Sequence, residues 1–434
     1  MNDEKIKVAF HTLGCKLNFT ETSTIARSFP EDKFERVPAG KKADIYIINT
    51  CSVTDTADKK CKQAIRKFIN QSPEAFIAVV GCYAQLNPSE IASIPGVDLV
   101  LGINEKFDVA QYFTGNKAIK QPEIHSCELT SSERFVHSYS SGDRTRSFLK
   151  VQDGCDYHCS YCTIPLARGA SRNPSIETLL AETALIASKG VKEIVVTGVN
   201  IGDFGKSTGD DFKTLMKELI KTEGIERFRI SSIEPNLLTD ELLVMLAGES
   251  KILPHFHIPL QSGCNRILAL MGRRYKRELF SERVNRIKEL IPMAGIGADV
   301  IVGFPGETSA DFDETYEFLR ATPLSYLHVF SYSGRPNTKA DQMPGKINSS
   351  TKEERSKLLI SLSQSKHREF MNQNTGHEAF VLFEKSRTGG MITGYTGNYL
   401  RVEYPWDQKL AGQIKKVKLT GISDNERMSI QIIQ

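Results

Sequence analysis

The sequence predicts a multidomain α/β protein with three parts: a parallel α/β N-terminal domain, an open partial (β/α)6 barrel and a small C-terminal OB-like β-barrel. The chain has 434 residues, too many for one ordinary hydrophobic core. Short branched apolar runs alternate with amphipathic helical patterns as far as about residue 370, as in parallel sheets. The pattern then changes to short strands separated by glycine turns. We expect domains at residues 1–140, 141–372 and 373–434.

The composition is that of an ordinary globular protein. Charged residues make up 25% of the chain, and 56 basic against 52 acidic residues give a net charge of +4, which neither requires nor excludes nucleic acid. The N-terminus lacks a signal-peptide core, and no run approaches the ~18 apolar residues of a membrane span. We therefore expect a cytoplasmic protein with no membrane partner. In that compartment, nine cysteines are more often ligands or catalysts than disulfides.

The first part predicts a parallel sheet with intervening helices. Its strands are expected at Lys7–Thr12, Asp44–Asn49, Phe76–Val80 and Asp98–Leu101. Thr54–Asn70 has a helical period that places Cys61 on the apolar face, which favours core packing for that thiol. The polar stretch Ser126–Thr145 predicts a linker to the second part.

The second part predicts six β/α units. Its strands are expected at Ser147–Gln152, Glu193–Thr197, Arg227–Ser231, His255–Pro259, Ala298–Gly303 and Tyr326–Ser331. Helical patterns separate them at Ile176–Lys189, Asp211–Lys221, Asp240–Ala247, Glu278–Ile291 and Ala310–Arg320. Six units are fewer than the eight of a closed barrel, so an open barrel is expected, with its site at the carboxyl ends of the strands. A long charged helix, Lys352–Asn372, then leads to the third part.

Five short strands predict a small closed barrel in the third part. They are expected at Glu378–Glu384, Met391–Thr393, Tyr399–Tyr404, Gln413–Thr420 and Met428–Ile433. Lys416 and Lys418 alternate on one strand and share a face, which would either meet phosphate or protect an edge against aggregation. The aromatic residues that would either stack on bases or pack the barrel are Tyr395, Tyr399, Tyr404 and Trp406.

The strongest chemical signal is a C-x3-C-x2-C run formed by Cys155, Cys159 and Cys162, directly after the first strand of the second part. Three thiolates so close together can hold one four-iron cluster and leave one iron open to a small molecule. The alternative is structural zinc, which requires four closed ligands. His158 falls inside the run, but no second CxxC or HxxxH pair follows nearby. The spacing therefore favours the cluster.

Three further cysteines, Cys15, Cys51 and Cys82, each stand just beyond a predicted strand of the first part. In an open parallel sheet, ligands bind in the crevice outside the carboxyl ends of the strands, so these thiols could converge despite separations of 36 and 31 residues. The alternative is that they are small apolar residues at crowded strand ends. Spacing by itself leaves both interpretations open.

The C-x3-C-x2-C run, with Tyr161 before its last cysteine, resembles the signature of the radical S-adenosylmethionine (SAM) superfamily. The resemblance implies a partial β/α barrel and a 4Fe-4S cluster on the three cysteines, with SAM chelating the open iron. An electron from the cluster would then split SAM into methionine and a 5′-deoxyadenosyl radical.

The segments around Cys15, Cys51 and Cys82 resemble the N-terminal domain of the methylthiotransferases. That resemblance covers essentially the whole chain, since the third part is similar to the TRAM domain, an RNA-binding module of this family. It implies a second 4Fe-4S cluster on the three N-terminal cysteines. The cysteines assigned to neither cluster are Cys61, Cys127 and Cys264.

Residues at the carboxyl ends of the barrel strands are the candidates for the SAM and substrate site. The residues expected at the cofactor are Tyr161, Thr197, Asn200, Ser232, Glu234, Gln261, Arg273 and Phe330. A simple βα turn also explains the segment at Thr197, and a helix cap explains Glu234 nearly as well. Arg273 or Arg274 matches a carboxylate or a phosphate. The candidate RNA contacts are Arg274, Lys416 and Lys418.

The family resemblance implies a reaction on tRNA. One SAM would donate a methyl group and a second would supply the radical. The product would carry a methylthio group at C2 of an adenosine beside the anticodon (position 37). The implied partners are the tRNA anticodon stem-loop, a reducing electron-donor protein and a sulfur source. We expect the protein to act as a monomer.

The residues around the first cysteine bear on the substrate. The segment Thr12–Asn18 is most similar to the branch that acts on N6-threonylcarbamoyladenosine. The isopentenyladenosine branch usually has glutamine and methionine after this cysteine, and the ribosomal-protein branch has proline and lysine. Lys16 and Leu17 fit neither. Those two substrates stay as alternatives, and so does a non-catalytic RNA-binding protein with structural metal sites.

Overall fold

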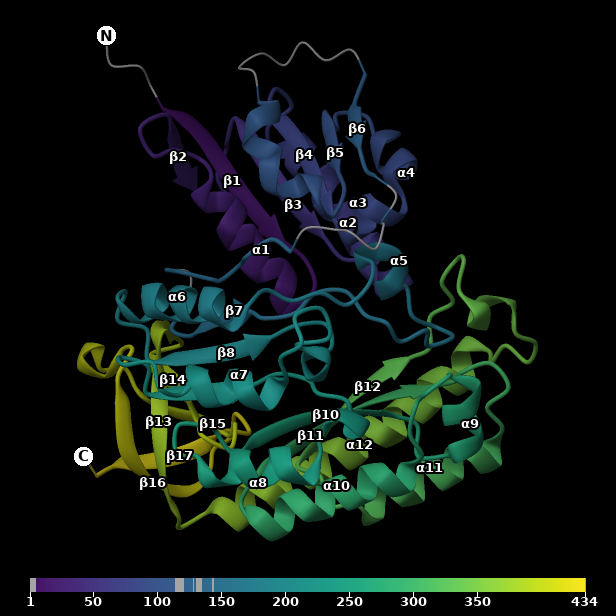
Figure 1. Cartoon of the computed structure of the whole chain (residues 1–434), viewed down its shortest axis with the longest axis vertical. Helices are drawn as coiled ribbons and strands as arrows, with labels where there is room; N and C mark the ends of the chain where they lie inside the picture. The colour runs from purple at the N-terminus through teal and green to yellow at the C-terminus, as the bar shows by residue number, and fades with distance from the viewer. Residues whose placement is uncertain (1–4, 114–120, 128, 130–134, 143, 434) are drawn as a thin grey trace.

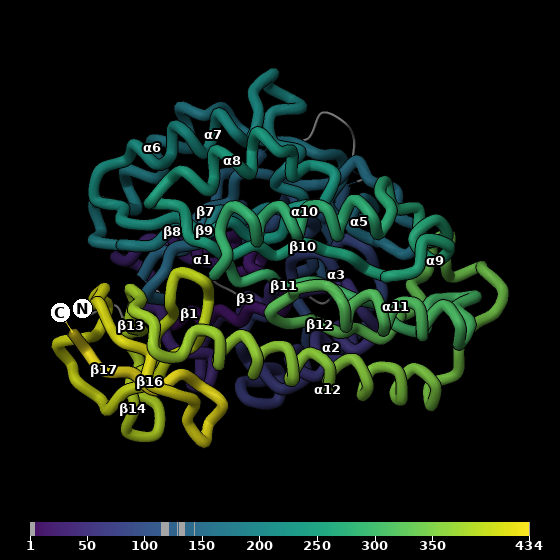
Figure 2. Tube along the Cα trace, turned by 90° about the horizontal axis from the view of Figure 1, so that it is seen from below, coloured from purple at the N-terminus to yellow at the C-terminus, as the bar shows by residue number. Residues whose placement is uncertain are grey.

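The computed structural model describes residues 5–113, 121–127, 129, 135–142 and 144–433. Figure 1 shows an N-terminal sheet lying above a row of barrel strands, with a small closed barrel at the lower left. The long helix α12 (Ser349–Asn374) runs beside β12 (Tyr326–Ser331), as Figure 2 shows from below. The predicted multidomain α/β class is confirmed. Over the described ranges, no helix is long and apolar enough to cross a membrane.

The N-terminal sheet has six parallel strands in the order β2-β1-β3-β4-β5-β6. Their bounds are Ile6–Thr12 (β1), Phe34–Val37 (β2), Ile45–Thr50 (β3), Phe76–Gly81 (β4), Leu99–Leu101 (β5) and Glu123–His125 (β6). The edge strands β2 and β6 were not predicted, because both are short and largely exposed and therefore lack an apolar pattern. The strand order reverses between β1 and β3, which is where such sheets form a ligand crevice.

Helices cover both faces of this sheet. They are α1 (Lys16–Arg27), α2 (Asp55–Gln71), α3 (Cys82–Leu86), α4 (Pro88–Ala92) and the 3-10 helix η1 (Glu105–Tyr112). Residues alternate between two cores, so Ile48 packs with Phe68 of α2 and its neighbour Ile47 packs with Ile25 of α1. Helix α2 agrees with the prediction and begins at Thr54, whose side chain accepts a hydrogen bond from the N–H of Ala57.

The central part is an open row of six parallel strands, as predicted. They are β7 (Ser147–Lys150), β8 (Glu193–Thr197), β9 (Arg227–Ile230), β10 (His255–Gln261), β11 (Gly295–Val302) and β12. They form two three-stranded sheets, β7-β8-β9 and β10-β11-β12, which a parallel bridge between Ser232 and His257 joins. The helices that follow the strands are α5 (Ile164–Arg168), α6 (Ile176–Ala187), α7 (Phe212–Leu219), α8 (Asp240–Gly248), α9 (Asn265–Leu270), α10 (Arg277–Leu290) and α11 (Ser309–Ala321).

The C-terminal part is a closed five-stranded barrel in the order β13-β14-β15-β17-β16, as predicted. Its strands are β13 (Glu378–Thr388), β14 (Met391–Thr396), β15 (Arg401–Pro405), β16 (Ile414–Ile422) and β17 (Met428–Ile432). Tyr404 and Trp406 pack against its core. Lys416 and Lys418 share the outer face of β16, out of phase with buried Val417, and the Lys416 ammonium lies 2.5 Å from the Glu378 carboxylate.

The stretch predicted as a linker is packed over part of its described length. Ser138 and Ser140 are buried, and Tyr139 forms an antiparallel bridge with Leu149 of β7. The Arg27 guanidinium donates to the Tyr139 carbonyl at 2.9 Å. The short polar side chains find partners here, which a polar composition by itself does not reveal. Residues 128, 130–134 and 143 of the predicted linker lie outside the described residues.

Candidate functional site

The loop after β7 carries Cys155, Cys159 and Cys162 along the wall of a cavity of about 390 Å³. Each sulfur atom accepts one N–H hydrogen bond, which favours the thiolate form. The donors are the backbone N–H groups of Tyr157 and Ile164, each 3.4 Å from its sulfur, and the Arg273 guanidinium, 3.2 Å from its sulfur. Burial raises the pKa of the Cys155 thiol to about 11. Burial therefore opposes ionisation of this thiol, and a bound metal cation would favour it.

The other walls of the cavity come from the carboxyl ends of the barrel strands. The predicted cofactor residues that line it are Tyr161, Asn200, Ser232, Glu234, Gln261, Arg273 and Phe330. Thr197 is not one of the lining residues, because it is buried at the end of β8, where its carbonyl accepts the N–H of Val151 at 2.9 Å. Tyr157 and Asp299 also line the cavity but were not predicted. Only the alternation along β11, which turns Asp299 toward the barrel interior, could have indicated that carboxylate.

An ion pair connects the cysteine loop to the cavity floor. The Arg273 guanidinium contacts both the Cys159 sulfur and the Glu234 carboxylate. Burial raises the pKa of Glu234, although Arg273 opposes that shift. Arg274 lies outside the cavity, where its guanidinium covers the Tyr157 ring at 4.0 Å and donates to a backbone carbonyl. The two neighbouring arginines therefore occupy different surroundings.

Gln261 holds an uncommon backbone conformation at the edge of the same cavity. Its φ is 70°, in the left-handed region, and the pairing of β10 with β11 shifts register between Pro259 and Gln261. Such strain persists where the surroundings require it, often at functional sites. The bulge places the Gln261 amide on the cavity wall.

The three N-terminal cysteines lie at one edge of their sheet. Cys15 precedes α1 after β1, Cys51 follows β3 and Cys82 begins α3 after β4. Because β1, β3 and β4 are adjacent parallel strands, their carboxyl ends meet. A Cβ on Gly14 would lie only 2.7 Å from the Cys51 sulfur, so this glycine permits the close approach. Burial, with Cys82 and Cys15 adding to it, raises the pKa of Cys51 to about 12.

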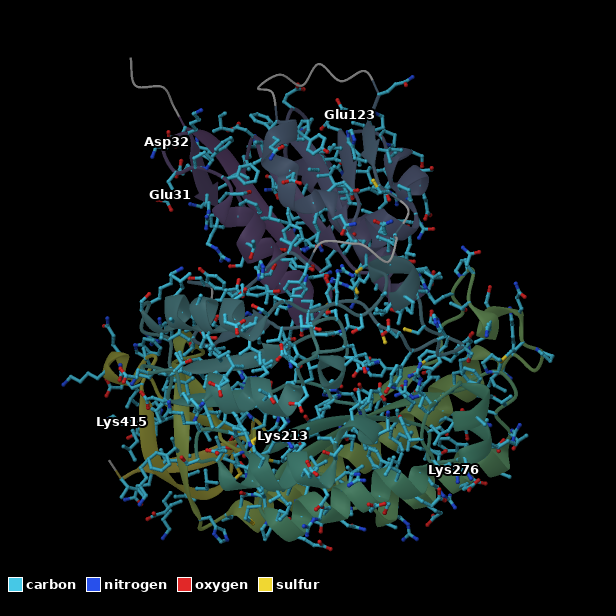
Figure 3. All side chains as sticks on the ribbon, in the orientation of Figure 1. Glu31, Asp32, Glu123, Lys213, Lys276 and Lys415 are labelled. Atoms are coloured by element: carbon cyan, nitrogen blue, oxygen red, sulfur yellow. The ribbon has the colours of Figure 1, made fainter. Side chains whose placement is uncertain are left out.

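Residues next to the N-terminal cysteines reach the cavity of the C-x3-C-x2-C loop. Val53 and Thr54, just after Cys51, line the cavity of the C-x3-C-x2-C loop. Helix α5, just after that loop, packs against α3, with Ala167 in contact with the hydrophobic cluster around Cys82. Figure 3 shows sulfur atoms (yellow) where the N-terminal sheet meets the barrel. The sequence therefore predicted which strands the cysteines of each group follow, but not how the two groups lie relative to each other.

The spread of the cysteine sulfurs bears on which metal group they fit. Within the described part of the chain, ligand atoms gather within 4.8 Å of one another at His257, Asp299 and His328, and at Cys264, Asp311 and Glu314. Neither set contains any of the six predicted cluster cysteines. Tetrahedral zinc, with Zn–S bonds of about 2.3 Å, needs sulfurs roughly 3.8 Å apart. Neither group of three thiols is therefore gathered as closely as a single zinc ion requires.

A buried charge network fixes the N-terminal sheet on the barrel. The Glu21 carboxylate of α1 lies 2.6 Å from Lys106, 2.9 Å from Arg168 and 3.1 Å from Lys150, and all four side chains are buried. Burial raises the pKa of Glu21, but the three cations outweigh it and hold that pKa far below its usual range. Helix α1 was not predicted, because the side chains that it buries are largely polar and give no apolar period.

A second contact fixes the loop that carries Cys51. Arg335 donates to the Ser52 hydroxyl at 2.6 Å and to Asp58 at 2.7 Å. Thr163, next to Cys162, donates to the Ser52 carbonyl at 3.3 Å. The two cysteine groups are therefore positioned by direct contacts between the N-terminal sheet and the barrel.

Buried arginines make the corresponding junction with the C-terminal barrel. Glu193 of β8 pairs with Arg227 at 2.7 Å and with Arg229 at 2.9 Å. Arg229 in turn donates to the carbonyls of Thr396 and Gly397. Burial raises the pKa of Glu193, but the arginines outweigh it and lower that pKa to about 2.

Comparison with known proteins defines the class first. The chain matches the family described as "Uncharacterized protein family UPF0004" over residues 7–102 and the "Radical SAM superfamily" over residues 149–319. With the partial barrel and its three-cysteine loop, this match makes the protein a radical SAM enzyme. A solved structure of the radical SAM methyltransferase TsrM from Kitasatospora setae has the same fold, with a TM-score of 0.56 and 14% identity over 78% of this chain and 77% of that one.

Full-length relatives then define the family. "Threonylcarbamoyladenosine tRNA methylthiotransferase MtaB" of Bacillus subtilis (strain 168) is 40% identical over 98% of this chain and 97% of its own length. The protein of the same name from Aquifex aeolicus (strain VF5) is 41% identical over 92% and 96%. A "tRNA-2-methylthio-N(6)-dimethylallyladenosine synthase" of Campylobacter jejuni subsp. jejuni serotype O:23/36 (strain 81-176) is 34% identical over 95% and 96%. The chain belongs to the tRNA methylthiotransferase family of radical SAM enzymes.

Proposed function

We propose that this protein adds a methylthio group to C2 of N6-threonylcarbamoyladenosine beside the tRNA anticodon, at position 37. Identity of 40–41% over almost the whole chain to enzymes named for that nucleoside carries the proposal. Two relatives named for the dimethylallyl nucleoside are 34% and 32% identical. The cavity, lined by one cysteine group and by Val53 and Thr54 next to Cys51 of the other, supports the chemistry, since sulfur insertion at an aromatic C–H needs a radical source and a sulfur source close together.

In this proposal the cysteines hold two 4Fe-4S clusters. Cys155, Cys159 and Cys162 bind the one that acts with SAM, and the N-terminal group binds the auxiliary one. The N-terminal group is Cys15, Cys51 and Cys82. When bound, the clusters and two SAM molecules supply the electron, the radical and the methyl group.

The protein's own residues position and shield the reactants. The Arg273–Glu234 pair forms a polar floor for the amino and carboxylate ends of a ligand in the cavity. Asn200, Ser232 and Gln261 offer further hydrogen-bonding groups, and Tyr161 and Phe330 offer ring faces. Val53 and Thr54 line the wall toward the N-terminal cysteines. In this proposal the substrate C2 lies between the two cysteine groups, where exclusion of water would favour the reaction.

The same proposal includes the remaining partners. The tRNA anticodon stem-loop is the substrate, with Arg274, Lys416 and Lys418 as contacts to its backbone. An electron-donor protein and a sulfur source complete the cycle, and the enzyme works as a cytoplasmic monomer. The domains proposed for these tasks are residues 1–140 for the auxiliary cluster, 141–372 for radical chemistry and 373–434 for RNA.

Nucleoside mass spectrometry of tRNA from cells with and without this gene tests the proposal. We expect the methylthio form of threonylcarbamoyladenosine to disappear while the unthiolated form accumulates. Loss of the methylthio isopentenyl nucleoside instead would overturn the substrate and keep the chemistry. An unchanged nucleoside profile would redirect attention to ribosomal proteins or to a non-catalytic RNA-binding role.

A further inference from the structure

A second cavity, of about 340 Å³, opens where the N-terminal sheet, the central barrel and the C-terminal barrel meet. We call it the cationic cleft. Its charged lining residues are Lys16, Arg144, Arg146, Arg229 and Glu384. Cys15, Tyr395 and Tyr399 also line it, so the cleft lies directly beside the N-terminal cysteine group. Four basic side chains against one acidic side chain make its wall strongly positive.

Two of the arginines in the cleft, Arg229 and Arg146, differ in how far their charge and hydrogen-bond donors are satisfied by partners. Arg229 donates to Glu193 and to the carbonyls of Thr396 and Gly397, so its donors are occupied. Arg146 lies 3.8 Å from Glu193, which it shares with two other arginines, and its guanidinium covers the Tyr395 ring at 4.6 Å. Glu193 therefore leaves positive charge uncompensated on the cleft wall.

The other two cations face the cleft without an acidic partner in the described part of the chain. Arg144 covers the Phe19 ring at 4.4 Å. Lys16 is accessible from the cleft, and no hydrogen bond or ion pair joins it to a described residue. The one acidic lining residue, Glu384, accepts the Thr393 hydroxyl at 2.7 Å. Cations that are crowded together in this way are stabilised by an anionic ligand.

The cleft also holds a strained backbone. Tyr399 has a φ of 73°, which is rare for a bulky residue, and its ring stacks on Tyr395 with centroids 4.9 Å apart. Arg229 covers the Tyr399 ring at 4.6 Å. Backbone strain of this kind concentrates at ligand sites. The stacked tyrosines therefore form part of the same cavity lining as Lys16.

The chemistry of the proposed substrate matches this site. In adenine, C2 and the carbon that bears N6 flank N1, so an N6 substituent lies along the same edge as C2. A threonylcarbamoyl group there ends in a carboxylate and a hydroxyl, whereas a dimethylallyl group is uncharged and apolar. Lys16 directly follows Cys15. With C2 facing the N-terminal cysteines, the carboxylate is therefore within reach of a lysine side chain anchored beside them.

We propose that the cationic cleft binds the carboxylate of the substrate's N6-threonylcarbamoyl group, with Lys16 as its direct partner and Arg146 as its second. The inference rests on the function proposed above, and it identifies residues that select this nucleoside over one with a neutral N6 substituent. A phosphate of the tRNA backbone offers the same anionic chemistry, so the test separates the two sources.

The test measures binding of three anticodon stem-loops to the iron-reconstituted enzyme by anaerobic fluorescence anisotropy. The loops are identical except at the target adenosine, which carries N6-threonylcarbamoyl, its uncharged methyl ester or no substituent. The variants are Lys16→Gln, Lys16→Arg and the matched control Lys42→Gln. Lys42 is exposed and lies at the opposite end of β3 from Cys51. Iron content and absorption near 400 nm report whether each variant retains its clusters.

We expect wild type to bind the acid loop about tenfold more tightly than the ester loop, the value of one hydrogen bond to a charged group. Lys16→Gln should lose that preference, while Lys16→Arg and Lys42→Gln keep it. The unsubstituted loop should bind all four proteins alike. Arg146→Gln, distant in sequence from the cysteines, provides a second test and should lose part of the preference even if Lys16→Gln loses iron.

Several results would overturn the inference. A preference for the acid loop that survives both Lys16→Gln and Arg146→Gln would place the carboxylate elsewhere. Equal weakening of all three loops would assign the cleft to a backbone phosphate. A wild-type enzyme that methylthiolates the acid loop but does not bind it more tightly than the ester loop would refute carboxylate binding in the cleft. The proposed function would still hold. Methylthiolation of a dimethylallyl loop instead would refute the proposed function itself.

Discussion

The two cysteine groups are assembled in different ways: the C-x3-C-x2-C group lines the cavity itself, and the N-terminal group adjoins it through Val53 and Thr54, just after Cys51. Cys155, Cys159 and Cys162 come from a single loop, and two of their three hydrogen-bond donors are backbone N–H groups of that loop. The N-terminal cysteines follow three separate strands and meet only because those strands are adjacent. Their position over the barrel depends in addition on the buried network around Glu21. A ligand set within one loop is visible in sequence spacing, whereas a set collected from three strands depends on the tertiary fold.

Removing one cysteine from the single-loop group should have the largest effect. We expect Cys155→Ala to abolish SAM cleavage, because two thiols cannot hold the cluster that the loop is built for. Chromatographic measurement of 5′-deoxyadenosine under reducing, anaerobic conditions checks this. Cys127→Ala, at an exposed cysteine, is the control and should cleave SAM normally. A normal deoxyadenosine yield from Cys155→Ala would contradict the assignment of Cys155 as a ligand of the cluster that cleaves SAM.

Removing one cysteine from the three-strand group should separate the two halves of the reaction. Cys51→Ala should still cleave SAM but should insert no sulfur, since the loop at residues 155–162 is complete without it. Parallel measurement of deoxyadenosine and of the methylthio nucleoside gives both readouts. A fully active Cys51→Ala enzyme would contradict the auxiliary-cluster role and the comparison built on it.

The Glu21 network should matter for stability. Glu21→Gln leaves Lys106, Lys150 and Arg168 buried with one fewer anion, and breaking such a cluster costs about 3–5 kcal/mol. Urea unfolding measures the loss, with Glu31→Gln, at an exposed glutamate, as control. Iron should be lost preferentially from the N-terminal group. Unchanged stability would mean that the network does not hold the sheet on the barrel.

Acid should weaken the junction at Glu193 in a defined window. Its folded pKa of about 2 lies below the ordinary value of 4.5, so the ionised carboxylate stabilises the fold above about pH 4.5. That stabilisation, about 3 kcal/mol, is lost as the pH falls from about 4.5 toward 2. The free energies of unfolding of wild type and Glu193→Gln should therefore converge over this range. A gap between them that is independent of pH would contradict the pairing with Arg227 and Arg229.

The smallest effects are expected on the C-terminal barrel. Lys416→Gln and Lys418→Gln should each weaken tRNA binding about twofold and lower the salt dependence by about one phosphate contact. Lys416 is already paired with Glu378, so its effect should be the weaker of the two. Binding titrations at several salt concentrations measure both variants, with Lys213→Gln on α7 as control; Figure 3 labels Lys213 on the barrel. If neither lysine variant changes the salt dependence of tRNA binding, the outer face of β16 does not contact the RNA.

Local patterns predicted the strands other than the short exposed edge strands β2 and β6, the long helices with an apolar face and the C-x3-C-x2-C loop. They also failed where polar residues are buried. Helix α1 buries Asn18, Thr20 and Glu21, which carry no apolar period, and the partners of Glu21 lie 85, 129 and 147 residues away. Thr197 was expected in the cavity because it ends a strand, but its side chain is buried and the neighbouring turn lines the wall. The position of a residue at a strand end predicts that it lies near the edge of the site, but it does not predict which way its side chain points.

The sequence by itself determined the class of protein, the open barrel, the closed C-terminal barrel and the three cysteines of one loop, because each depends on neighbours close along the chain. Only the tertiary structure decided that the N-terminal cysteines lie at one sheet edge, that Val53 and Thr54 border the same cavity as Cys155, and that Lys16 and Arg146 line one cleft. These relations depend on strand order and on buried ion pairs between distant residues. Their energies arise from burial and charge in three dimensions, which sequence spacing does not encode.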